Sequence, residues 1–296
     1  MQTFIPLPEL VKRHRDTVAA VTAAGVEPPA RWRELDAALT TYTATEFTAA
    51  QRLADQIVRP IKSVDVAALR AMAIAEAMAT PGAVATVQGS VVSAVHAAML
   101  EAWSVSADNA YRQIADQFNA AADLFVAAAQ VADPAAAATD MVAADEPVRQ
   151  SWLTCAVQSA RLDELVLPLC YSAELTGLRI TAADEQIAQS WWQADVADEA
   201  VIPLVCDPGQ LHRRKVWDAY ENTTGRTGRW GALVAVGATI RAPLSLDGFE
   251  RYRRPKPVIH KQRQITGAPL GYIENVALDP EDADYRTMLP PIDVLR

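Results

Sequence analysis

A basic stretch in the last quarter of the chain carries the residue types best suited to binding a negatively charged partner. It reads RYRRPKPVIHKQR over residues 251–263, and its fixed positive charges are Arg251, Arg253, Arg254, Lys256, Lys261 and Arg263. Clustered cations of this kind neutralise phosphates or carboxylates, and the interleaved Tyr252 offers a ring on which a base could stack. Pro255 and Pro257 favour an extended backbone that holds the charges outward.

The charge distribution allows two interpretations of this basic arm. Residues 1–206 contain 13 basic and 25 acidic side chains, whereas residues 207–263 carry a net charge of +7. We favour pairing of the arm with the acidic part, either in the same chain or in a neighbouring copy. Nucleic-acid binding is the alternative, and Arg213 and Arg214 would extend its surface, although a solvated helix face explains them more simply.

Familiar catalytic and metal-binding patterns are missing from the sequence. It contains no G-x-S-x-G motif, and no cysteine has a histidine nearby. The four histidines are far apart, and His96 lies between valine and alanine, which indicates a core or interface position. We therefore predict no catalytic residue, no metal and no cofactor. An enzyme whose site is assembled from scattered residues is a third alternative.

Two further patterns bear on location and redox state. No uninterrupted apolar run reaches about 18 residues, and the first residues lack the order of a secretory signal. We therefore expect no membrane span, and a protein that is cytoplasmic or incorporated in a virion-like assembly. Cys155, Cys170 and Cys206 are odd in number and widely spaced, which predicts unlinked, mostly buried thiols.

The elements that must position these residues are mostly helices. Two long alanine-rich helices are expected within residues 82–132, joined near Ser104–Asp108, because apolar residues recur at steps of three and four. We expect this pair to pack together and against further helices. Caps, prolines and glycines predict the other helices. They are expected from Pro6 to Gly25, from Pro29, from Thr43–Glu46 to Pro60, over 64–79, over 147–167 up to a break or kink at Pro168, from Thr181 through Trp191 and Trp192, and over 208–220.

The character of the chain changes after Asn222. Glycines at 225, 228 and 231 precede a valine-rich stretch at 232–242 that is typical of a strand, and 258–265 and 271–278 are two further candidate strands. We therefore predict a mainly α fold in two parts. Residues 1–221 form a bundle-like, alanine-rich helical body, and residues 222–296 form a small β-containing, proline-rich segment with the basic arm.

These expectations lead to a ranked set of functions. The leading hypothesis is a non-catalytic structural or assembly protein that acts through protein–protein contacts, by self-association or within a larger protein assembly. Phage and mobile-element virion components often have this architecture, which is an analogy of shape only. Under this hypothesis the arm contacts the acidic helical body of another copy. The alternative is nucleic-acid binding through residues 212–263.

Overall fold

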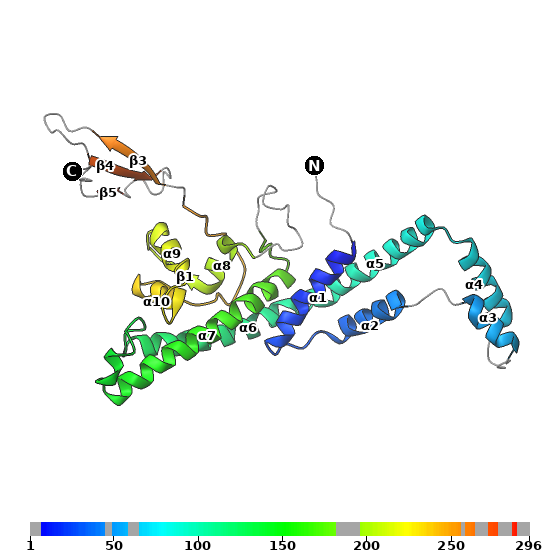
Figure 1. The fold of residues 1–296 in the computed structure, drawn as a ribbon, viewed down its shortest axis with the longest axis horizontal. Helices are drawn as coiled ribbons and strands as arrows, with labels where there is room; N and C mark the ends of the chain where they lie inside the picture. The colour runs from blue at the N-terminus through cyan, green and yellow to red at the C-terminus, as the bar shows by residue number, and fades with distance from the viewer. Residues whose placement is uncertain are drawn as a thin grey trace.

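The structure is a computed structural model that describes residues 7–44, 49–58, 65–181 and 196–255, together with the backbone of strands 258–263, 272–277 and 286–288. Over these residues the protein is mainly α-helical, as the sequence predicts. The molecule is elongated: most helices gather at one end, a short helical hairpin lies at the other, and longer helices connect the two (Figure 1).

The larger end is a body built on two long helices, α6 (Ala107–Ala129) and α7 (Glu146–Leu175). Apolar residues spaced three and four apart along both helices are almost fully buried between them, namely Ile114, Phe118, Phe125, Leu162, Leu165 and Leu169. Pro168 lies inside α7 and does not break it, because Leu165 and Leu169 anchor the helix on both sides of the proline. The predicted end at residue 167 is therefore wrong.

Three short helices complete this body: α8 (Asp198–Val205), α9 (Arg213–Tyr220) and α10 (Gly228–Ala235). The expected strand over 232–242 is mostly wrong, since α10 runs to Ala235 and only β2 (Thr239–Ile240) is extended. Trp230 and Leu233, one helical turn apart, are both fully buried, and Gly237 ends the turn with a φ of 86°. The core thus continues across the division expected after residue 221.

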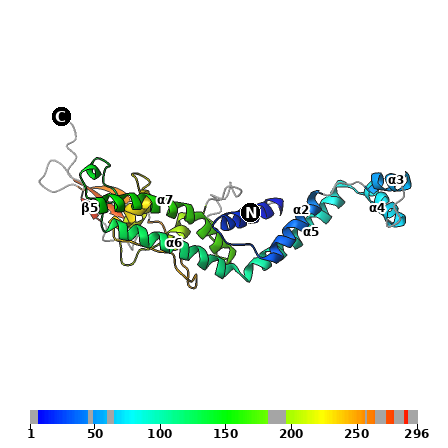
Figure 2. The ribbon, with the colours of Figure 1, turned by 90° about the horizontal axis from the view of Figure 1, so that it is seen from below.

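A connecting stem links the body to the far end. It consists of α1 (Leu7–Ala23), α2 (Ala30–Ala44) and α5 (Pro81–Ser104), with Gly25 closing α1 at a φ of 92°. The bounds of α5 and α6 confirm the predicted pair and its junction. The two helices lead away from each other, however, and α5 packs mainly on α2 (Figures 1 and 2). Only the last turns of α5, with Met99 and Trp103, enter the main core.

The far end is a hairpin of α3 (Ala49–Val58) and α4 (Val66–Met78). Asp65 caps α4 by accepting hydrogen bonds from the Ala67 and Ala68 amides, and Glu76 accepts from the Ala49 amide at the start of α3. The helix expected from Thr43–Glu46 starts later, because α2 continues through Thr43, whose hydroxyl donates to the Leu39 carbonyl. The helix expected through Trp191 and Trp192 lies outside the described residues.

Strands are few among the described residues. β1 (Cys206–Asp207) pairs antiparallel with β2. Before residue 222, the described part of the chain has β1 as its one named strand, which agrees with the predicted helical body. A separate antiparallel sheet has the order β3 (Val258–Arg263), β4 (Tyr272–Ala277) and β5 (Arg286–Met288), with the first two close to their predicted ranges. Helix α9 starts at Arg213 rather than at Pro208, because His212 is its N-cap. A single 3₁₀ turn, η1 (Asp140–Val142), follows α6.

Candidate functional site

The hairpin and the adjoining part of α5 carry a concentration of exposed apolar side chains. We call this group the distal surface; its members are Ile57, Val58, Val66, Met72, Ile74, Met78 and Val87. Other large apolar side chains are exposed on the body, such as Leu124 on α6 and Val157 on α7, but many of them fall within this short hairpin and the start of α5. A local concentration of exposed apolar residues is characteristic of an interaction surface.

The hairpin has little core of its own to account for this composition. Within residues 49–58 and 65–80, the buried side chains are Ala49, Gln56 and Leu69. An isolated pair of short helices with so small a core is marginal in water, because helix stability comes mostly from packing an apolar face. Contact of the distal surface with another molecule would therefore stabilise this hairpin.

Helix α5 continues this surface toward the body. Residues 81–100 contain no Asp, Glu, Lys or Arg, although most of them are exposed. A Cβ atom added at Gly89 would meet nothing within 4 Å, so no packing inside the chain requires glycine there. By length and composition alone, α5 is also long and apolar enough to cross a membrane, although the sequence contains no uninterrupted apolar run of about 18 residues.

The basic arm begins docked on the body rather than extended. Arg251 donates to the carbonyl oxygens of Arg179 and Thr181 at 2.6 and 2.7 Å, and the Arg253 carbonyl accepts from the Trp217 indole at 3.2 Å. Arg254 pairs with Glu221, and its guanidinium lies 4.9 Å from the centre of the Trp217 ring.

This docking is a pairing within the same chain, which is one of the two pairings expected for the arm. The Arg254 amide also donates to Glu199 at 3.2 Å, so acids of the same chain hold the start of the arm. Arg251 and Arg253 are half-buried, which departs from the expectation of a fully exposed arm, whereas Arg254 is exposed.

The other predicted binding residues that the structure describes lie on α9 and on β3. Arg213 and Arg214 open α9, and the Arg213 guanidinium lies 5.9 Å from the centre of the Tyr252 ring. Lys261 and Arg263 are on strand β3, where they pair in register with Glu274 and Tyr272. Lys256 lies outside the described residues. The structure thus brings Arg213 and the start of the arm together through Tyr252.

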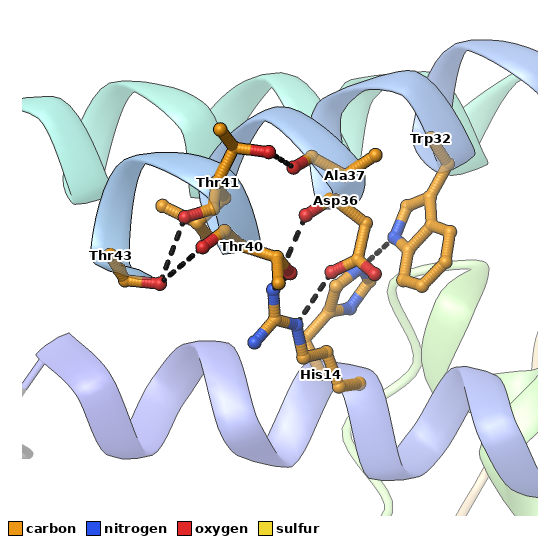
Figure 3. A network of polar contacts seen from close by, with 9 residues as sticks. His14, Trp32, Asp36, Ala37, Thr40, Thr41 and Thr43 are labelled. Atoms are coloured by element: carbon orange, nitrogen blue, oxygen red, sulfur yellow. Dashed lines mark hydrogen bonds and ion pairs between the residues drawn. The ribbon is translucent and has the colours of Figure 1, made fainter. Parts of the chain in front are cut away.

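A second group of polar residues lies where α1, α2 and α5 meet. The Trp32 indole donates to Nε2 of His14 at 2.9 Å, and the His14 and His96 rings meet edge to face with centres 5.7 Å apart. Figure 3 shows the surrounding network, in which Trp32 and Asp36 of α2 lie beside His14. Arg15 donates to Asp36 at 2.6 Å and to Thr40 at 2.9 Å, which ties α1 to α2.

Burial keeps these imidazoles neutral. Burial is the main reason that the pKa of His14 falls to about 4; the nearby His96 lowers it further, and Asp36 opposes the change. Burial also lowers the pKa of His96. A neutral His14 that accepts a hydrogen bond at Nε2 carries its proton on Nδ1. Sequence spacing did not predict this pair, because the two residues are on helices that only the fold brings together.

The three thiols are buried and free. Burial is the largest cause of the raised pKa values of Cys170 and Cys206, both to about 12, so these thiols stay protonated. Among the described residues, no group of three His, Cys, Asp or Glu side chains is placed to hold a metal ion.

Comparison with known proteins adds no relative. No protein-family model matches the chain, and neither the curated proteins nor the solved structures contain a significant match. The class defined by the fold is that of a mainly α-helical protein with an elongated shape.

Proposed function

We propose that this chain is a structural or assembly protein that acts through protein–protein contacts, with the distal surface as its main contact. The observation that carries the proposal is the position of that surface at the end of a stem, away from the main core. An element that projects from a folded body and keeps its apolar residues exposed is well suited to joining subunits. A virion-like assembly is one setting that would use such a protein.

The size of the distal surface supports a stable contact. Its seven side chains are between 45% and 77% exposed. A standard interface buries about 800 Å² on each partner. Helix α5 borders these side chains, and its uncharged residues 81–100 would supply a further part of such an interface.

The charges around the distal surface favour a second copy of this chain as the partner. The described residues of the hairpin carry Arg52 and Arg70 against Asp55, Asp65 and Glu76, so the two signs are nearly balanced. In a twofold dimer the same patch of each copy faces the other. A patch with balanced charges therefore avoids net electrostatic repulsion between the two copies. A nucleic acid would instead require an excess of positive charge.

The first experiment compares two pairs of substitutions at exposed apolar positions. Met72→Glu with Met78→Glu places charges in the distal surface, where the side chains are 55% and 77% exposed. Leu153→Glu with Val157→Glu is the matched control on α7, where the side chains are 48% and 64% exposed. We expect the distal variant to weaken self-association roughly tenfold or more, because unpaired charges would be buried in the contact.

Sedimentation velocity over a wide range of concentration measures the association, and far-UV circular dichroism reports the fold. Equal association of the parent, distal and control proteins would contradict the proposal. If α5 instead binds membranes, the parent protein should float with phosphatidylcholine vesicles and should not self-associate. That result would also contradict the proposed assembly role.

A further inference from the structure

The body holds the start of the basic arm at a site that two short helices build. We call it the arm-docking site; its members are Glu199 in the first turn of α8, Trp217 on α9, and Glu221, the C-cap of α9. The Tyr220 hydroxyl donates to Asp198 at 3.2 Å, which ties the end of α9 to the start of α8. The site therefore depends on the packing of two helices and not on a single run of sequence.

The arm-docking site contacts the main chain of the arm as well as its side chains. The Tyr252 amide donates to the Glu199 carbonyl oxygen at 2.8 Å, and the Arg254 amide donates to the Glu199 carboxylate at 3.2 Å. Between these two amides, the Arg253 carbonyl accepts from the Trp217 indole at 3.2 Å. Main-chain hydrogen bonds of this kind bind an extended segment, and side-chain contacts then select its sequence.

Two arginines of the arm make the selective contacts. The Arg254 side chain pairs with Glu221. Arg251 donates from one nitrogen to the carbonyl oxygens of Arg179 and Thr181, at 2.6 and 2.7 Å. A guanidinium group suits both places, because it combines a fixed charge with several directed donors. The body therefore fits an extended segment that has arginines three positions apart.

The connection between the body and the arm is a surface loop with few ties of its own. Asn119 fixes its base through two hydrogen bonds with the main chain of Ala242, at 2.7 and 3.1 Å. Within the described residues, the hydrogen bonds of residues 244–250 stay inside the loop, and Leu246 and Phe249 pack partly on the core. Beyond the arm, the β3–β5 sheet stands apart from the helices (Figure 1). A second body that offers the same site can therefore replace most contacts that the arm loses on leaving its own.

We propose that the arm-docking site binds residues 251–254 of a second copy of this chain, so that two bodies exchange arms. Each copy carries both the site and the arm, so the exchanged pair recreates the docking contacts twice. A short tether favours the arm of the same copy, because it holds that arm at an effective concentration of roughly millimolar. Exchange therefore joins bodies where they are crowded, and on this point the inference rests on the assembly proposed above.

A reciprocal reversal of charge tests the exchange. All proteins carry Met72→Glu with Met78→Glu, so that the distal surface does not join the chains. One protein adds Glu221→Arg and the other adds Arg254→Glu, so that each alone opposes like charges at this pair. The side chains of Arg254 and Glu221 are 58% and 45% exposed, so both proteins should keep their fold, which circular dichroism checks. In an equimolar mixture, opposite charges meet only between the two proteins.

Sedimentation velocity measures the outcome. We expect each protein alone to have the mass of a single chain, and the mixture to form a species of twice that mass with roughly tenfold or more tighter association. A single protein with both Glu221→Arg and Arg254→Glu is the control. It restores the pair within one copy and should behave as the background does.

A mixture that keeps the mass of a single chain overturns the proposal. Equal association of either protein alone overturns it as well, because like charges then meet at the pair. Neither result bears on the distal surface, since every sample carries the two charges that disrupt it. Failure of arm exchange is therefore distinguishable from failure of the proposed assembly.

Discussion

At the scale of single residues, buried polar groups make the stem sensitive to pH. His14 is neutral in the folded protein because burial, chiefly, lowers its pKa to about 4, whereas an unfolded chain has a value near 6.5. The unfolded state therefore binds more protons between these two values. The contribution of a neutral His14 to stability is complete above pH 6.5 and is lost as the pH falls toward 4.

We predict that His14→Gln removes this part of the acid sensitivity, because glutamine does not titrate and its amide oxygen can still accept from Trp32. The parent should lose roughly 3 kcal/mol more than the variant between pH 7 and pH 4. Urea unfolding at both pH values measures the difference. Parallel losses in the two proteins would show that His14 does not cause the effect.

Arg254 is one of the residues that hold the start of the basic arm on the body. Arg254→Glu places a third carboxylate beside Glu221 and Glu199 and removes the cation over Trp217. We predict that this repulsion releases residues 251–255 and accelerates tryptic cleavage after Arg251 and Arg253 severalfold. Arg241→Glu is the control at another exposed arginine and should leave the cleavage rate unchanged.

At the scale of elements, two glycines give opposite expectations for the same substitution. A Cβ atom at Gly231 would lie 2.4 Å from Oγ1 of Thr227, a residue that is itself buried, whereas Gly89 faces open space inside a helix. Gly231→Ala should lower the free energy of unfolding by about 1–3 kcal/mol. Gly89→Ala should raise it by about 0.5–1 kcal/mol. Denaturant unfolding at equal protein concentration tests both, and effects of the same sign would contradict the packing of α10.

Local sequence signals predicted most helices. They failed where tertiary packing determines whether a segment is a helix or a strand, or whether a helix continues. Proline and glycine signals gave the start of α2 and the end of α1, because they act through the backbone alone. Valine content suggested a strand over 232–242, but Trp230 and Leu233 enter the core on a helical turn. Pro168 suggested a break, yet the contacts of α7 with α6 keep the helix continuous.

The candidate surfaces were harder to predict than the helices. The basic residues were recognisable by charge, but the pairing of Arg254 with Glu221 depends on how the chain folds back. The distal surface was missed because the helix expected over 64–79 does not by itself show which of its side chains other elements cover, and Met72 and Ile74 stay exposed. His14 and His96, 82 positions apart, meet only through the packing of α1 on α5.

At the scale of the whole molecule, the separation of the two ends matters most. The main core runs through the body and the near part of the stem, and the body also holds the start of the basic arm, whereas the far end of the stem holds the distal surface away from both (Figures 1 and 2). Contacts made through the far end would leave the body accessible. The shape therefore predicts that assembly and arm docking can be disrupted separately.

The measurement that tests the central claim most directly is the native mass of the purified full chain, with its nucleic-acid content read from the same sample. The account predicts discrete multiples of the 32.0 kDa chain that form without nucleic acid. A 32.0 kDa monomer at every concentration would contradict assembly through the distal surface. Species that form only with bound nucleic acid would contradict it as well and would favour a role for the basic arm in nucleic-acid binding.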